Sequence, residues 1–300
     1  MSTPQRQTSP GASFKIPAGD VALAADAYGY PGDPPVVLLH GGGQTRHSWH
    51  ATAADLGSSG WHAVTVDLRG HGDSDWSPDH GYGLDRFSED VVRVAEHVGR
   101  PPVLIGASLG GNAALAALGH QPELATGLVL VDVSPFLQPA GTTRIRDFMA
   151  ANAVQGFGSL EEAADAVAAY VPHRKRPRNL NGLRKNLRER DGRWFWHWDP
   201  AFMSSPADQA VQRDPLIDAA RLGAAASSLR VPTLLVRGGE SDVLSVEDSA
   251  RFISLVPHAE FATVGGAHHM VAGDDNAVFE QVLADFLERR IRSRLELLGG

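Results

Sequence analysis

The sequence predicts a doubly wound α/β fold, in which helices cover both faces of a mostly parallel sheet. Short continuous runs of apolar and β-branched residues are typical of strands that are buried on both faces. Longer segments with helical periodicity alternate with these runs, as they do in α/β proteins. The length of 300 residues and the apolar fraction of 43% are sufficient for one large domain of this class or two small ones.

The predicted strands share a short apolar core that is bounded by turn residues. They are Val36–Leu39, Ala63–Val66, Val103–Ile105, Leu128–Val131, Pro232–Val236 and Glu260–Val264. Leu84–Val98 and Gly111–Gly119 are predicted to be helices between strands. A final helix is expected from about Ala277, because apolar residues recur there at i, i+4 and i+8 and form a stripe that can pack on the sheet.

Composition excludes several classes of protein. A net charge of −8 is not typical of proteins that bind nucleic acids or anionic membranes. The absence of cysteine excludes disulfides, thiolate zinc sites and a cysteine nucleophile. Neither a secretory signal nor a membrane-length apolar run of roughly 20 residues is present. We therefore expect a cytoplasmic protein with a small-molecule substrate as its partner, and leave open whether it is a monomer or a homodimer.

A long stretch without a clear sheet strand divides the chain. We predict a flexible tail over residues 1–12, a core formed by 13–133 and 231–300, and a helical lid over 134–230. The position of this stretch between two sheet strands is typical of an inserted lid above a site at the edge of the sheet.

The lid contains several distinct segments. A capping box at Ser159–Glu162 predicts a helix over Ala163–Tyr170, and Leu180–Arg190 is a second, basic helical candidate. The aromatic run Trp194–Trp198 either lines a pocket or attaches the lid to the core. The basic run His173–Arg178 either binds an anionic group of the substrate or is a solvated surface.

The strongest chemical signal is the G-x-S-x-G pattern of Gly106–Gly110, which lies between a predicted strand and a predicted helix. A sharp strand-to-helix turn exposes the serine at the carboxyl edge of the sheet, and the glycines tolerate the strained backbone. The alternative is a glycine-rich turn in which the serine only caps the helix. We predict that Ser108 is a nucleophile.

A glycine-rich loop, His40–Gly43, follows the strand Val36–Leu39. Glycines allow backbone N–H groups to approach a developing oxyanion closely, and we assign this role to the N–H groups of Gly42 and Leu109. A phosphate-binding loop would need a G-x-G-x-x-G pattern or a Walker lysine, and neither is present. His40 itself is expected to be structural.

A serine nucleophile needs a base, and the base needs a carboxylate to fix its tautomer. The glycine-rich loop after Glu260–Val264 holds two adjacent histidines, of which we favour His269 over His268. We favour Asp242 as the acid, because it lies on the loop after the strand Pro232–Val236, and the resulting chain order is serine, acid, histidine. Glu240 and Asp132 are the alternatives. The residues predicted to line a substrate pocket are Gly43, Trp194, Trp196, Trp198, Val243 and His268.

Together, these motifs resemble the α/β-hydrolase superfamily, in its serine-nucleophile branch with a helical cap. The resemblance rests on the His40–Gly41 loop, the segment Asp67–Ser74, the turn at Ser108, and the loops of Asp242 and His269. It implies an α/β-hydrolase fold and a reaction without cofactor or metal. The family's D-x-R-G-x-G-x-S turn is usually structural, so Asp67 and Arg69 are expected in turn and ion-pair roles. Because position 108 is serine, the aspartate-dependent dehalogenases and epoxide hydrolases are excluded.

The resemblance implies hydrolysis of an acyl bond, with a carboxylic ester or a lactone of a largely apolar substrate as the leading class. Hydrolysis of a C–C bond, perhydrolysis and cofactor-free oxygenation are alternatives on the same fold. A receptor-like member that binds a ligand with little turnover belongs to a different class of function.

Overall fold

The computed structural model describes residues 11–172, 176, 179–203, 218–269, 271 and 277–299. Residues 1–10 of the predicted tail and most of the basic run His173–Arg178 lie outside the described residues. The predicted tail extended too far, because strand β1 already begins at Ala12.

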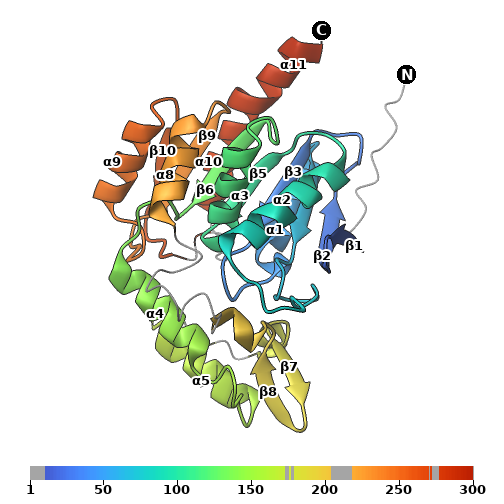
Figure 1. The fold of residues 1–300 in the computed structure, drawn as a ribbon, viewed down its shortest axis with the longest axis vertical. Helices are drawn as coiled ribbons and strands as arrows, with labels where there is room; N and C mark the ends of the chain where they lie inside the picture. Colours follow the sequence, from blue (N-terminus) through green and yellow to red (C-terminus); the bar gives the residue numbers. More distant parts are fainter. Residues whose placement is uncertain are drawn as a thin grey trace.

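A single eight-stranded sheet crosses the core (Figure 1). In sheet order its strands are β1 (Ala12–Ala18), β2 (Val21–Tyr28), β4 (His62–Val66), β3 (Pro35–Leu39), β5 (Val103–Ala107), β6 (Gly127–Val131), β9 (Thr233–Gly238) and β10 (Glu260–Val264). β1 and β2 pair antiparallel with their neighbours, and the strands from β4 to β10 pair in parallel. The predicted mostly parallel sheet is confirmed.

Each central strand is buried on both faces, which explains its continuous apolar sequence. In β3, Val37 and Leu39 belong to one hydrophobic cluster, whereas Val36 and Leu38 belong to the other. The antiparallel pair of β1 and β2 lies at one edge of the sheet and was not among the predicted strands. Its mixed apolar and polar sequence differs from the continuous runs that mark the central strands.

Helices cover both faces of the sheet, as predicted. One face carries α2 (Leu84–Val98), α3 (Leu109–His120), α8 (Ala219–Ser228) and α9 (Val246–Leu255). The other carries the turn η1 (Arg46–Trp49), α1 (His50–Ser58) and the C-terminal helical segments α10 (Ala277–Phe286), η4 (Leu287–Arg292) and α11 (Ser293–Gly299). In the C-terminal stripe, Phe279, Leu283 and Phe286 are buried, whereas Val278 is exposed. No helix among the described residues is long and apolar enough to cross a membrane.

A separate layer, which we call the cap, lies beyond the carboxyl ends of the parallel strands (Figure 1). It contains α4 (Pro139–Ala150), α5 (Leu160–Tyr170), α6 (Asn181–Arg184), β7 (Leu187–Arg190), β8 (Arg193–Trp196) and η2 (Pro200–Met203). The hydroxyl of Ser159 accepts a hydrogen bond from the N–H of Glu162, which confirms the predicted capping box at the start of α5.

The cap is not purely helical. The predicted helix over Leu180–Arg190 is wrong in its second half, where β7 pairs antiparallel with β8. Asp191 and Gly192, between the two strands, both have positive φ, of 50° and 72°. An Asp-Gly pair in this conformation is typical of a tight hairpin turn. This pair is the feature of the sequence from which the two strands could have been predicted.

The predicted lid boundary at residue 230 lies too late in the sequence. Helix α8 falls within the predicted lid but packs against α3 of the core. A Cβ atom on Gly119 would lie 2.6 Å from Cβ of Ala225, so the two helices are in direct contact. The described part of the cap therefore ends near Met203.

Candidate active site

Ser108 sits at a strained turn between β5 and α3. Its φ of 47° and ψ of −115° are unusual for a residue with a side chain. A Cβ atom on Gly106 would lie 2.4 Å from the N atom of Gly111, and one on Gly110 would lie 2.5 Å from the carbonyl oxygen of Leu39. Glycine is required at both positions because the backbone packs so tightly there. Because of this turn, Ser108 is partly exposed although its flanking residues are buried.

The glycine loop after β3 lies directly beside Ser108. A Cβ atom on Gly41 would be 3.3 Å from Cβ of Ser108. The N–H of Gly41 donates to the side chain of Gln44, and the N–H of Gly43 donates to Nε2 of His71. The N–H groups of Gly42 and Leu109 donate to no acceptor within the described residues, so both can bind an incoming oxygen atom.

Three buried histidines surround this loop, namely His40, His71 and His197. Nε2 of His40 accepts a hydrogen bond from the N–H of Leu68, so the proton of the neutral ring is on Nδ1, which donates to the carbonyl oxygen of Gly41. His40 is therefore structural, as predicted. His71 and His197, which also contact the loop, were missed, because nothing in the sequence places them beside Gly43.

All three imidazoles are held in their neutral forms. Burial lowers the pKa of His40 to about 4. Burial, together with the nearby His40, lowers the pKa of His71 to about 3. Burial and the neighbouring His71 also lower the pKa of His197 well below its usual value. At neutral pH each ring can therefore accept one hydrogen bond and donate another.

We expect the fold to lose stability at a mildly acidic pH, above the pH at which most carboxylates become protonated. In the unfolded chain His40 and His71 bind protons near their usual pKa of 6.5, whereas in the folded protein they do so only near about 4 and about 3. Between these values the unfolded state binds more protons, so the free energy of unfolding decreases as pH falls below 6.5, by roughly 2 kcal/mol for each histidine at about pH 5. Urea unfolding at a series of pH values measures this slope.

The variant His71→Gln is the matched control for this pH dependence. An amide oxygen can replace Nε2 as the acceptor for the N–H of Gly43, but the side chain does not titrate. The slope of the unfolding free energy against pH should therefore be smaller in this variant. An unfolding free energy of the native protein that is constant from pH 7 to about pH 5 would contradict the neutral cluster.

The histidine after β10 is paired with an aspartate that follows β6. Nδ1 of His269 lies 2.7 Å from Oδ2 of Asp132. Asp132 is fully buried, and its carboxylate also accepts hydrogen bonds from the N–H of Gly238 (2.8 Å) and the hydroxyl of Ser241 (2.5 Å). Three donors thus fix the carboxylate. The N–H of Ser108 donates to the carbonyl oxygen of Val131, the residue before Asp132, so the serine and the aspartate are neighbours across the sheet.

The prediction that Asp242 contacts the histidine is wrong. Asp242 forms a bidentate ion pair with Arg144 of α4, at 2.8 and 3.0 Å, and its side chain is 48% exposed. Although partial burial opposes ionisation, the hydrogen bond and charge of Arg144 lower the pKa of Asp242. Both aspartates follow sheet strands, but only Asp132 follows the strand next to β5. The N–H of Gly238 and the hydroxyl of Ser241, both beyond or at the end of β9, hold the carboxylate of Asp132 beside His269.

The other candidates near this site occupy different positions. Glu240 is exposed on its loop, with its N–H donating to the carbonyl oxygen of Ala267. Val243 is buried, and its carbonyl oxygen accepts a hydrogen bond from the N–H of Gln138 at the start of α4. The side chain of His268 is half-buried beside His269. Of the two adjacent histidines, it is His269 that is hydrogen-bonded to Asp132.

The aromatic run of the cap divides between two environments. A Cβ atom on Gly43 would lie 3.4 Å from Cζ3 of Trp198, so Trp198 covers the glycine loop. Trp196 stacks on Trp198 with ring centroids 4.8 Å apart, inside the cap. Trp194 is half-buried at the start of β8, where Arg184 lies over its ring. Of the three tryptophans, Trp198 is the one placed beside the loop.

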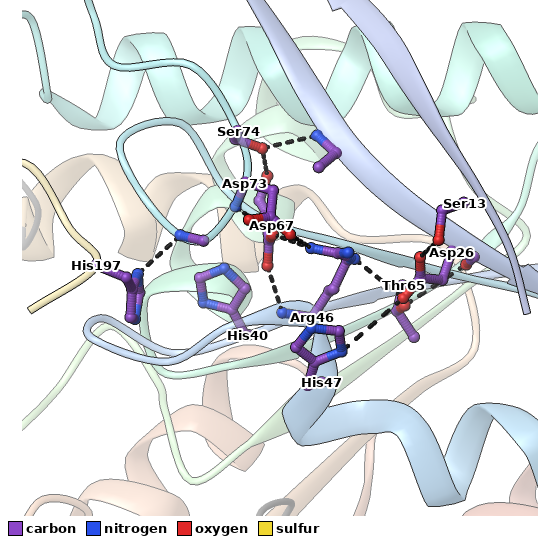
Figure 2. Close-up of polar contacts among 12 residues, drawn as sticks. Ser13, Asp26, His40, Arg46, His47, Thr65, Asp67, Asp73, Ser74 and His197 are labelled. Atoms are coloured by element: carbon purple, nitrogen blue, oxygen red, sulfur yellow. Dashed lines mark hydrogen bonds and ion pairs between the residues drawn. The ribbon is translucent and has the colours of Figure 1, made fainter. Parts of the chain in front are cut away.

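A network of ion pairs joins Arg46, which follows the glycine loop, to the Asp67–Ser74 turn and to β2 (Figure 2). Arg46 donates to Asp26 at 3.0 Å and to Asp73 at 2.9 Å, and it also pairs with Asp67. Arg69, on the same turn as Asp67, forms a bidentate pair with Asp90, with both distances 2.7 Å. The predicted structural roles of Asp67 and Arg69 are confirmed.

The fold, the strained serine turn, the glycine loop and the buried pair of His269 and Asp132 are together characteristic of one class of enzyme. A family model described as the alpha/beta hydrolase fold matches residues 34–275. The chain belongs to this family, and it is an enzyme of the hydrolase class.

Several known proteins with similar sequences or structures are named as esterases, lipases or hydrolases. The chain is 31% identical over 269 residues to an esterase of Mycobacterium tuberculosis, covering 86% of this chain and 84% of the relative. It is 29% identical over 287 residues to the sn-1-specific diacylglycerol lipase of Mus musculus, covering 92% and 84%. The crystal structure of the Mycobacterium tuberculosis esterase matches with a TM-score of 0.73 at 28% identity, covering 93% of both chains. An alpha/beta hydrolase from Novosphingobium aromaticivorans matches with a TM-score of 0.78 at 26% identity, covering 94% and 99%.

Proposed function

We propose that this protein hydrolyses a carboxylic ester or a lactone of a small, largely apolar substrate through a Ser-His-Asp triad. The observation that carries the proposal is the 2.7 Å hydrogen bond between Nδ1 of His269 and the buried carboxylate of Asp132, beside the strained turn of Ser108. A carboxylate in this position holds the imidazole in the tautomer in which Nε2 can accept a proton. The esterase and lipase names of the relatives support an ester as the substrate.

In the proposed reaction the hydroxyl oxygen of Ser108 attacks the acyl carbon while its proton moves to Nε2 of His269. The N–H groups of Gly42 and Leu109 stabilise the negative charge that develops on the acyl oxygen. The protonated His269, stabilised by Asp132, then gives its proton to the leaving alcohol. Water, deprotonated by the same histidine, attacks the acyl-enzyme and releases the acid and the free serine.

The surface above the glycine loop supports an apolar substrate. A Cβ atom on Gly42 would lie 3.7 Å from Sδ of Met149 and 3.8 Å from Cζ of Phe202. Side chains of the cap therefore face this residue. Met149, Trp198 and Phe202 are all buried apolar residues. Ligand pockets are mostly apolar with few polar groups, and this combination matches an apolar acyl or alcohol group better than a charged one.

A panel of p-nitrophenyl esters with short, medium and long acyl chains, together with simple lactones and a vinylogous diketone, tests the proposal. We expect turnover of esters or lactones that follows saturation kinetics, and covalent labelling of Ser108 by a fluorophosphonate probe in mass spectrometry. Turnover of the diketone alone would instead indicate a C–C bond hydrolase. No turnover and no labelling would overturn the proposal in favour of a binding protein.

A further inference from the structure

The buried histidines contact consecutive peptide groups of the glycine loop. Nδ1–H of His40 donates to the carbonyl oxygen of Gly41 at 2.8 Å, which fixes the peptide between Gly41 and Gly42. Nε2 of His71 accepts the N–H of Gly43 at 3.2 Å, which fixes the next peptide. Nε2 of His197 lies 3.3 Å from the carbonyl oxygen of Gly43, which belongs to the third. Each of these three peptide planes is therefore held by one imidazole.

The third imidazole differs from the other two because it belongs to the cap. Nδ1 of His197 accepts a hydrogen bond from the N–H of Gly72 at 2.7 Å (Figure 2), so its proton is on Nε2, which donates to Gly43. The N–H of His197 itself donates to the carbonyl oxygen of Asn186, beside β7. The side chain thus links the cap hairpin to two loops of the core.

Besides these imidazoles, Gln44 holds the start of the loop: its side chain accepts the N–H of Gly41, and its own N–H donates to the carbonyl oxygen of Gly41. These two bonds do not involve Gly43. Gly43 has a positive φ of 73°, and glycines are the most flexible residues of a chain. The proposed oxyanion donor, the N–H of Gly42, belongs to the peptide whose carbonyl oxygen His40 holds, and the next two peptides of the loop are held by His71 and His197. Donors in an oxyanion hole act only when they are aligned with the developing charge, so a small rotation of these peptides lowers the rate.

We propose that His197 is a positioning residue of the oxyanion hole, through which the attached cap holds the glycine loop in its active conformation. The inference rests on the proposed function, because it concerns the stabilisation of an oxyanion formed from Ser108. It assigns a role in transition-state stabilisation to a cap residue whose hydrogen bonds go to Gly72, Gly43 and Asn186 and not to the proposed triad. In this role the side chain of His197 accepts the N–H of Gly72 and donates to the carbonyl oxygen of Gly43 at the same time.

Two substitutions separate these two contacts. In His197→Asn the amide oxygen takes the place of Nδ1 and can still accept the N–H of Gly72, but no donor reaches Gly43. In His197→Gln the amide N–H reaches the position of Nε2 and can still donate to the carbonyl oxygen of Gly43. Each variant keeps one of the two hydrogen bonds, so a loss of stability alone should affect both of them to a similar extent.

We expect His197→Asn to lower kcat on an ester by about tenfold to a hundredfold with KM nearly unchanged, because only the transition state loses an interaction. The inhibition constant of a trifluoromethyl ketone, which forms a tetrahedral oxyanion with the serine, should rise by a similar factor. His197→Gln should recover most of the activity and of the inhibitor affinity. The melting temperature of each variant is measured alongside.

Arg188→Ala is the matched control for cap attachment. Arg188 of β7 also links the cap to the core, through the carbonyl oxygen of Gly72 at 2.8 Å and Asp73 at 2.7 Å, but it does not contact Gly43. Inhibitor affinity should be unchanged in this variant. The inference alone is overturned if the wild-type protein hydrolyses esters but His197→Asn keeps its kcat and inhibitor affinity, or if Arg188→Ala shows the same loss. A wild-type protein that neither hydrolyses esters nor binds the ketone overturns the proposed function as well.

Discussion

Replacing Ser108 by alanine should lower kcat for ester hydrolysis at least about ten-thousandfold, since the acyl-enzyme can no longer form. The fold should be unchanged. The backbone turn already accommodates a side chain with φ of 47°, and the serine hydroxyl makes no capping hydrogen bond to α3, so its removal leaves no capped N–H without a partner. Steady-state kinetics with the best substrate of the panel and thermal unfolding measure the two quantities.

Ser249→Ala is a suitable control for this experiment. Ser249 is a buried serine of α9, where its hydroxyl donates to the carbonyl oxygen of Ser245, away from the proposed triad. This variant should keep wild-type kcat. Esterase activity of Ser108→Ala within tenfold of wild type would show that another group is the nucleophile.

Asp132→Asn should lower kcat by about ten-thousandfold, and it should also lower the melting temperature, because the hydroxyl of Ser241 loses the buried Oδ2 as its acceptor. The oxygen of the new amide can still accept the N–H of Gly238, but the amide N–H faces Nδ1 of His269 and favours the tautomer whose Nε2 carries the proton. Such a histidine cannot deprotonate Ser108. The buried carboxylate that stabilises the imidazolium in the transition state is also lost.

Asp242→Asn is the informative comparison, because Asp242 was the acid favoured from the sequence. In the structure it pairs with Arg144, and the two side chains are 48% and 44% exposed, so the loss of this pair should cost only about 0–1 kcal/mol of stability. We expect kcat to stay within about threefold of wild type. A large loss in Asp242→Asn together with a small loss in Asp132→Asn would reverse the assignment of the acid.

The parts of the site that depend on local sequence could be predicted. The turn at Ser108 requires glycine on both sides, and its strand and helix are continuous segments with clear patterns, so the position of the serine follows from neighbouring residues. The glycine loop after β3 is also local. His269 was favoured from its place on a loop after the last strand, and its hydrogen bond to Asp132 is consistent with that choice.

The acid could not be chosen in the same way, because several aspartates follow strands. The sequence around each aspartate does not specify which side chains the folded chain places next to it. β6 and β9 are parallel neighbours whose carboxyl ends meet at the same edge of the sheet, and the contacts of the loops that follow them hold Asp132 beside His269 and Asp242 beside Arg144. The structure of the cap also could not be predicted from local sequence alone. The basic segment before Asp191 is compatible with a helix, and the hairpin is stabilised by pairing with β8.

By itself, the sequence determined the α/β class, the mostly parallel sheet, the serine turn and the glycine loop, because each depends on periodicity or on backbone freedom within a few residues. The tertiary structure decided which carboxylate reaches His269, where the cap ends, and which imidazoles hold the glycine loop. His40 and His71 become neighbours when the core folds, and His197 joins them when the cap packs on the core. Contacts of this kind depend on packing between distant segments, and no local pattern of residues specifies them.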